Sequence, residues 1–303
     1  SVGMTALVPV LCLFVLFAGL VDSWRWGFTP LARGYIVPSA GKHQQLEVAT
    51  LRSIPVRAVV AAADEIEPHL SDRRWIYLLP TIHPRNGPAA RYLAIDATVP
   101  AEPVEPHTLR VVFDRALRQG YGIDRAVDGV IVLRAGAPRH SLPTGFYSWL
   151  YQPGDRVTVR PVHWGSLTLT GFVVYPRNGQ VNRARPAVGV DTFWRTSSRL
   201  SSRVCITLYL SPVYHGRHPA FSSRWQRETD SPTWDWLPLV RWPIRRTIHA
   251  ALLPLVPAGG DSGKVDVAVG VSGSGKSTGR LPTVAGGGNI VRLGTISVEG
   301  AIQ

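Results

Sequence analysis

The chain has 303 residues, of which 45% are hydrophobic, so it can supply the cores of two ordinary domains as well as a membrane span. Its formal net charge of +13 comes mainly from scattered arginines, and no run of five or six basic residues occurs. This pattern argues against an arm that binds nucleic acid, and no nucleic-acid partner is expected. The two cysteines, Cys12 and Cys205, exclude a disulfide framework and a zinc site.

The first feature along the chain is an apolar run, Ala6–Val21, that carries no charge and precedes Asp22, Trp24 and Trp26. About 20 helical residues cross the hydrocarbon core of a bilayer, and tryptophan is enriched at the membrane interface. The run therefore predicts a transmembrane helix over residues 1–23, with the lipid bilayer as a partner. A secretory signal peptide and a buried core helix are the alternatives. A signal peptide would need a positively charged start, which is missing, and the apolar character all round the helix fits lipid better than a core.

Two further expectations depend on this run. Residues 24–50 would form a juxtamembrane linker and helix, and the bulk of the chain would be extracytoplasmic at the cell membrane. Because the chain begins at Ser1 and its only methionine is Met4, we expect a fragment whose N-terminal membrane spans are missing.

Residues 51–137 alternate between strand-like and helix-like segments, which predicts a small α/β domain. The clearest helical periodicity lies at 108–119, between Pro106 and Gly120. A turn is expected at Asp128 and Gly129. The other expected elements are a helix at His43–Arg52 and strands at Val56–Ala63, Trp75–Leu79, Arg91–Ile95, Tyr121–Arg125 and Gly129–Leu133.

From residue 138 to 303 the helical periodicity disappears. Apolar residues alternate with other residues in short runs, such as Val204–Leu210 and Val265–Val271, and Gly, Pro, Ser and Asn separate the runs. This period of two predicts antiparallel strands with one buried face, arranged as a β-sandwich. The expected fold class is therefore α+β, with one N-terminal transmembrane helix, a small α/β domain and then an all-β antiparallel sandwich.

Six segments of the α/β region form a joint pattern: Leu51–Pro55, Ala61–Asp64, Pro68–Ser71, Arg73–Pro80, Tyr121–Gly122 and Asp128–Arg134. Over about residues 51–136 this pattern resembles a bacterial family of membrane proteins known as domain of unknown function two thousand and seventy-nine. The strands after residue 138 are similar to the β-sandwich that trails some bacterial sugar-transferring membrane proteins.

The resemblance carries implications for function. It implies a polytopic parent similar to multi-span glycosyltransferases that use lipid-phosphate sugars, with an outward-facing domain after the last span. The catalytic acidic residue of such enzymes is expected on an early outward loop between the first spans. The resemblance therefore implies that this chain lacks the catalytic half, and no catalytic residue is assigned.

The segment Gly270–Ser277 matches the phosphate-binding pattern GxxxxGK[ST]. In that pattern the backbone around Gly275 cradles phosphates, Lys276 contacts them and Ser277 holds a magnesium ion. A helix must also start at the lysine, but Thr278–Pro282 contains two helix breakers. We therefore interpret the segment, from Gly270 on, as a hairpin turn between two strands. A nucleotide-binding enzyme is the alternative function.

Asp64 and Asp96 each follow or end an expected strand, and ligands of open α/β sheets gather at such carboxyl ends. With His69 and Arg73 nearby, they predict a ligand-binding site for a sugar or a phosphate group. The alternative is that the two carboxylates only cap a helix and shape a turn.

Trp234 and Trp236, with Trp225 and Trp242 nearby, could form a platform on which sugars stack, or an amphipathic patch on a membrane surface. Packing in a core is the alternative. No metal site and no cofactor are expected. Together these features predict a membrane-anchored accessory module that recognises cell-envelope glycan or lipid-linked sugar beside a missing catalytic half, and that is not an enzyme by itself.

Overall fold

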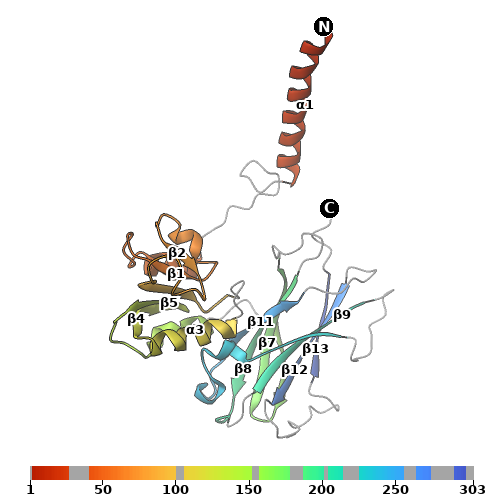
Figure 1. Cartoon of the computed structure of the whole chain (residues 1–303). Coiled ribbons are helices and arrows are strands. Elements are labelled where there is room, and N and C mark those ends of the chain that lie inside the picture. Colours follow the sequence, from red (N-terminus) through yellow and green to blue (C-terminus); the bar gives the residue numbers. More distant parts are fainter. Residues whose placement is uncertain are drawn as a thin grey trace. The chain divides into compact units, whose positions relative to one another are not determined.

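The computed structural model describes residues 2–26, 41–99, 106–151, 157–177, 187–200, 204–213, 225–255, 264–273 and 290–297. The chain divides into two units, Ser1–Gln45 and Leu46–Gln303. Figure 1 labels most of the helices and strands.

The first unit contains the helix α1 (Val2–Trp26). In the described part of the chain, no helix combines the length and the apolar character that crossing a membrane requires. The predicted N-terminal transmembrane helix is therefore wrong.

Five strands of the second unit form a mixed sheet in the order β2-β1-β3-β5-β4. β2, β1 and β3 are parallel, whereas β5 is antiparallel to β3 and to β4. The bounds are Ile76–Leu78 for β2, Val60–Ala62 for β1, Tyr92–Asp96 for β3, Val130–Ala135 for β5 and Tyr121–Val127 for β4. Each of these strands was expected from the sequence, although β1 is shorter than predicted because Val56 and Arg57 form a turn.

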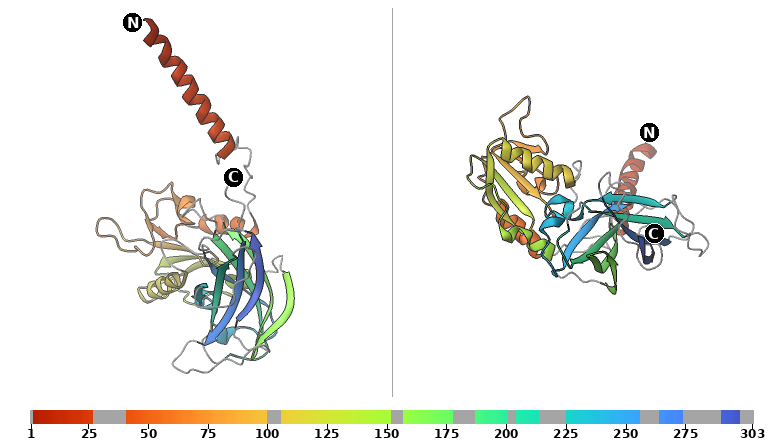
Figure 2. Two further views of the ribbon diagram at one scale, coloured as in Figure 1. Left: turned by 90° about the vertical axis from the view of Figure 1, so that its right-hand side faces the viewer. Right: turned by 90° about the horizontal axis from the view of Figure 1, so that it is seen from below.

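Successive side chains of these strands point to opposite faces of the sheet. One face packs against the end of α2 (Lys42–Leu51) and the short helix η1 (Glu67–Leu70), and the other packs against α3 (Pro106–Arg118), as Figure 2 shows. The first face buries Leu51, Ile54, Val60, Ala62, Ile66, Leu70, Tyr92, Ala94 and Val132. Alternate residues of the same strands, such as Ala61 and Leu93, belong to the core on the α3 side.

The helix α3 confirms the predicted amphipathic segment, although it begins two residues earlier than predicted, at Pro106. Proline suits this first position because its missing N–H has no helical partner there. Leu109, Val112 and Phe113 are buried, as their spacing of three and four residues requires. The helix is followed by Gly120, whose φ of +88° is accessible to glycine at little cost.

The remaining strands of the second unit form two antiparallel sheets of four strands, in the orders β11-β8-β7-β6 and β10-β9-β12-β13. The first sheet consists of β6 (Val157–Trp164), β7 (Leu167–Arg177), β8 (Ala187–Thr196) and β11 (Ile248–Leu255). The second consists of β9 (Val204–Pro212), β10 (Gln226–Asp230), β12 (Lys264–Gly273) and β13 (Ile290–Ser297). The expected fold class is corrected to three sheets, one mixed and two antiparallel, without a membrane-spanning helix in the described residues.

The mixed sheet and the antiparallel sheets share one hydrophobic core. Trp236 follows the short helix η3 (Pro232–Asp235) and packs edge-on against Phe113 of α3, with ring centroids 5.4 Å apart. It also lies 5.7 Å from Phe146, which belongs to the short helix η2 (Thr144–Tyr151). A tryptophan from the C-terminal half therefore anchors α3 of the N-terminal half.

Candidate functional site

Two of the predicted ligand residues, Asp64 and Asp96, lie at the carboxyl ends of neighbouring strands in the mixed sheet. β1 and β3 are adjacent and parallel, and Ala62 is in register with Ala94. Asp64 and Asp96 each come two residues further along, so the register brings them to neighbouring positions at the carboxyl end of both strands. The expectation that the two carboxylates meet there is consistent with this geometry.

Glu65 is a third member of this carboxylate group and was not predicted from the sequence. Burial, a side-chain hydrogen bond with Asp64 and repulsion from the charges of Asp64 and Asp96 raise the pKa of Glu65 to about 8. Its Oε2 atom is buried and has no hydrogen-bond partner among the described residues. The available signal in the sequence was the Asp-Glu pair directly after a buried strand.

Glu47 of α2 completes the group. A carboxylate oxygen of Glu47 lies within 4.8 Å of one of Asp96, and both residues are buried. Asp96 also accepts a hydrogen bond of 2.8 Å from the backbone N–H of Thr98, which is the turn-shaping role that the sequence offers as the alternative. Carboxylates at such distances can share protons, accept hydrogen bonds from sugar hydroxyls, or provide oxygen ligands to a hard cation such as Mg²⁺ or Ca²⁺.

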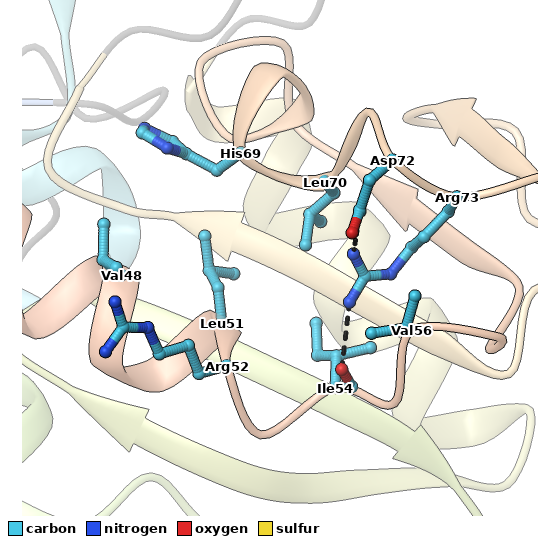
Figure 3. A pocket seen from close by; sticks show the side chains of 9 residues that line it. All are labelled: Val48, Leu51, Arg52, Ile54, Val56, His69, Leu70, Asp72 and Arg73. Carbon is cyan, nitrogen blue, oxygen red and sulfur yellow. Dashed lines mark hydrogen bonds and ion pairs between the residues drawn. The ribbon is translucent and has the colours of Figure 1, made fainter.

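The other two predicted ligand residues, His69 and Arg73, line a separate pocket with a volume of about 260 Å³ (Figure 3). The last turn of α2 and the segment after it form one side, and η1 with the residues that follow forms the other. The lining residues are Val48, Leu51, Arg52, Ile54, Val56, His69, Leu70, Asp72 and Arg73. The pocket therefore combines apolar walls with two arginines, one histidine and one aspartate.

Arg73 is the most buried polar group of this pocket, with a side chain that is only 5% exposed. Its Nη1 donates to Asp72 at 2.9 Å and its Nη2 donates to the carbonyl oxygen of Ile54 at 2.9 Å, as the dashed lines in Figure 3 show. Its Nε is buried and has no partner in the described part of the chain. Since Asp72 is 65% exposed, the charge of the guanidinium is only partly compensated.

Arg52 and His69 differ from Arg73 because their side chains are exposed at the mouth of the pocket. In Figure 3 the side chains of Arg52, which directly follows α2, and of His69 in η1 extend on the same side of the pocket. Arg52 was not predicted from the sequence, since a single arginine after a helix has no distinguishing signal. The four predicted polar ligands are thus divided between two places, because Asp64 and Asp96 do not line the pocket.

The predicted tryptophan platform does not exist as a surface. Trp234 and Trp236 are each 1% exposed, Trp225 is 6% exposed and Trp242 is 3% exposed. Stacking of a sugar requires an open aromatic face, which none of these residues offers. Trp234, Trp236 and Trp242 belong instead to the hydrophobic core that the sheets share.

Only the start of the predicted phosphate-binding segment can be described. Gly270–Gly273 continues the antiparallel strand β12 and pairs with Val204–Thr207 of β9, so these residues form strand where a phosphate-binding loop is required. Gly275, Lys276 and Ser277 lie outside the described residues.

Comparisons of the chain with protein-family models, with curated proteins and with solved structures find no match. The resemblance to domain of unknown function two thousand and seventy-nine therefore stays a prediction.

Proposed function

We propose that this chain is a recognition module, without catalytic activity of its own, that binds the phosphate-bearing end of a sugar phosphate or of a lipid-linked sugar. The observation that carries the proposal is the buried guanidinium of Arg73, which lines a cavity together with Arg52 and His69. Hydrogen bonds from arginine to phosphate are among the strongest in proteins, and partial burial strengthens them further.

The remaining walls of the pocket narrow the chemical class of the ligand. Leu51, Ile54 and Leu70 are almost fully buried and present apolar surface beside the cationic groups. A ligand that carries an anionic group next to carbon-rich surface fits such a lining better than a free inorganic ion does. The volume of about 260 Å³ lies just below the range of about 300–1,000 Å³ for sites that enclose drug-sized ligands. It suits a small molecule, or the end of a larger one.

The cellular role remains a proposal that depends on the sequence resemblance alone. In this role the chain is an extracytoplasmic accessory part of a glycosyltransferase-like membrane protein, and it presents or senses the lipid-linked or cell-envelope sugar on which the catalytic half acts. The basic pocket is consistent with this role because the sugar donors of such enzymes carry phosphate.

Calorimetric titration with a hexose 1-phosphate, with inorganic phosphate and with the unphosphorylated hexose tests the proposal. We expect the hexose 1-phosphate to bind, and we expect Arg52→Gln to weaken that binding about 10- to 100-fold, as the loss of one charged hydrogen bond of about 1.5–3 kcal/mol implies. Arg118→Gln makes the same charge change at the exposed end of α3 and should leave the affinity unchanged.

Three results would contradict the proposal. These are equal affinity for the phosphorylated and the unphosphorylated hexose, equal weakening by Arg52→Gln and Arg118→Gln, and the absence of binding at millimolar concentration. Arg73→Lys is a further test of the buried group. It keeps the charge but loses the planar fork of donors, so it should weaken phosphate binding while the chain stays folded by circular dichroism.

A further inference from the structure

A groove lies in the antiparallel part of the second unit. Its residues differ from those of the carboxylate group and of the basic pocket. It has a volume of about 530 Å³ and is lined by Arg199, Val240, Arg241, Trp242, Pro243 and Ile244. Arg199 follows β8, whereas the other residues lie on and after the short helix η4 (Leu239–Arg241). A backbone hydrogen bond of 2.8 Å from Arg245 to Thr196 joins the two segments.

Aliphatic side chains in this groove are open to solvent. Val240 is 56% exposed and Ile244 is 49% exposed, whereas Trp242 between them is 3% exposed. The indole N–H of Trp242 donates to the carbonyl oxygen of Leu237 at 3.0 Å. Trp242 thereby fixes the segment to the core, and the residues two positions before and after it are held outward.

Positive charge surrounds these aliphatic residues. Arg199 and Arg241 line the groove, and Arg245 and Arg246 follow directly in the chain; all four are exposed. The guanidinium of Arg246 also lies over the ring of Tyr151, 3.6 Å from its centroid. Neither of the two segments, residues 195–200 and 239–247, contains an aspartate or a glutamate.

The combination of exposed aliphatic side chains with surrounding arginines indicates the kind of partner. Proteins that bind single-stranded nucleic acid stack bases on exposed aromatic rings, but the aromatic residue of this groove is buried and the exposed residues are aliphatic. Peripheral membrane surfaces combine apolar side chains that enter the boundary between headgroups and acyl chains with basic side chains that contact acidic headgroups. An acidic bilayer satisfies both the apolar and the cationic features.

We propose that the groove around Val240 and Ile244 is a docking surface for the headgroup region of an anionic lipid bilayer. Val240 and Ile244 enter the boundary of the acyl chains, while Arg199, Arg241 and Arg245 contact lipid phosphates. This contact is peripheral and does not depend on the ligand of the basic pocket.

Hydrogen exchange measured by mass spectrometry on the full chain tests this surface locally, because it reports residues 239–247 separately from any other segment that contacts vesicles. Vesicles of phosphatidylcholine with phosphatidylglycerol should slow the exchange of amides within residues 239–247, and vesicles of phosphatidylcholine alone should not. The double variant Val240→Glu, Ile244→Glu should abolish this protection. Val111→Glu, at an exposed valine of α3 (43%), is the control and should keep the protection.

Several results would overturn the proposal. One is unchanged exchange of residues 239–247 on acidic vesicles, and another is equal protection by both kinds of vesicle. Protection by a single-stranded oligonucleotide but not by vesicles would assign the groove to nucleic acid instead. Because the double variant could alter the local fold, Arg199→Gln with Arg241→Gln serves as an independent variant. It should reduce the protection and make the remainder less sensitive to salt, since it removes only charge.

Discussion

Glu65 keeps its proton near neutral pH because burial and the neighbouring carboxylates of Asp64 and Asp96 disfavour its charge, which raises its pKa to about 8. A folded-state pKa above the ordinary value of 4.5 means that the folded protein binds this proton more tightly than the unfolded chain does. The stabilising contribution is complete below about pH 4.5 and is lost as the pH rises through about 8.

Glu65→Gln should remove this pH dependence, because glutamine mimics the protonated carboxyl and cannot ionise. We expect a melting temperature at pH 9 that exceeds that of the unmodified chain by about 2–4 °C for each kcal/mol recovered, and little difference at pH 5. Thermal unfolding followed by circular dichroism in the presence of a chelator measures both values.

Glu67→Gln, the same change two residues along the chain, is the control and should leave the pH profile as it is. If Glu65→Gln lowered the melting temperature equally at pH 5 and pH 9, the ionised carboxylate of Glu65 would not destabilise the fold at pH 9. This result would contradict the raised pKa. A rise in melting temperature on adding Mg²⁺ or Ca²⁺, lost in Glu65→Gln, would instead assign the group to a cation.

At the scale of elements, the turn between β4 and β5 connects two strands that were expected from the sequence. Asp128 (φ +48°) and Gly129 (φ +85°) both have left-handed backbone conformations, the combination that a two-residue hairpin turn requires. Gly129 has a second constraint, because a Cβ atom there would lie 2.2 Å from Cγ2 of Thr98. The turn is therefore fixed both by its backbone and by the segment that follows β3.

A comparison of two glycines separates these constraints. Gly120 has a similar φ of +88°, but no atom lies within 4 Å of where its Cβ would be. Gly120→Ala should cost about 1–2 kcal/mol of unfolding free energy from backbone strain alone, and Gly129→Ala should cost clearly more. Urea denaturation of both variants provides the two values, and equal costs would show that the contact with Thr98 is relieved by local movement.

For the second unit as a whole, Trp236 is the residue that joins its two parts. It contacts Phe113 and Phe146, and the guanidinium of Arg110 lies 5.3 Å from its ring centroid. Because the mixed sheet and the antiparallel sheets share this core, neither part should keep its packing when the other unfolds.

We expect Trp236→Ala to lower the unfolding free energy by about 3–5 kcal/mol, the usual cost of truncating a buried large aromatic side chain. Hydrogen exchange in increasing denaturant should show β3 and β9 losing protection at the same concentration, in the unmodified chain and in the variant alike. Trp75→Ala, at a tryptophan that is 37% exposed, should cost much less. Separate transitions of β3 and β9 would mean that the two parts fold independently.

Local patterns determined many of the elements. The periodicity of 108–119 predicts α3, and alternating apolar residues predict strands such as β9 and β12, since each pattern depends only on residues close in the chain. Local patterns are wrong at the N-terminus, where an apolar run predicts a membrane span that no described helix forms. They are also wrong at Trp234 and Trp236, which are buried; Trp236 packs against Phe113 of α3, more than 100 residues earlier.

The site divides in the same way. Asp64 and Asp96 could be predicted because each lies at or just after the end of a strand, and strand ends are a local property of the sequence. Only the tertiary structure decided that Glu65 and Glu47 join them, that Arg52 and Arg73 face one pocket, and that Val240 and Ile244 stay exposed while Trp242 is buried. The physical reason is that strand order, register and the packing between elements determine which side chains lie close together and which stay exposed. Each of these depends on residues far apart in the chain.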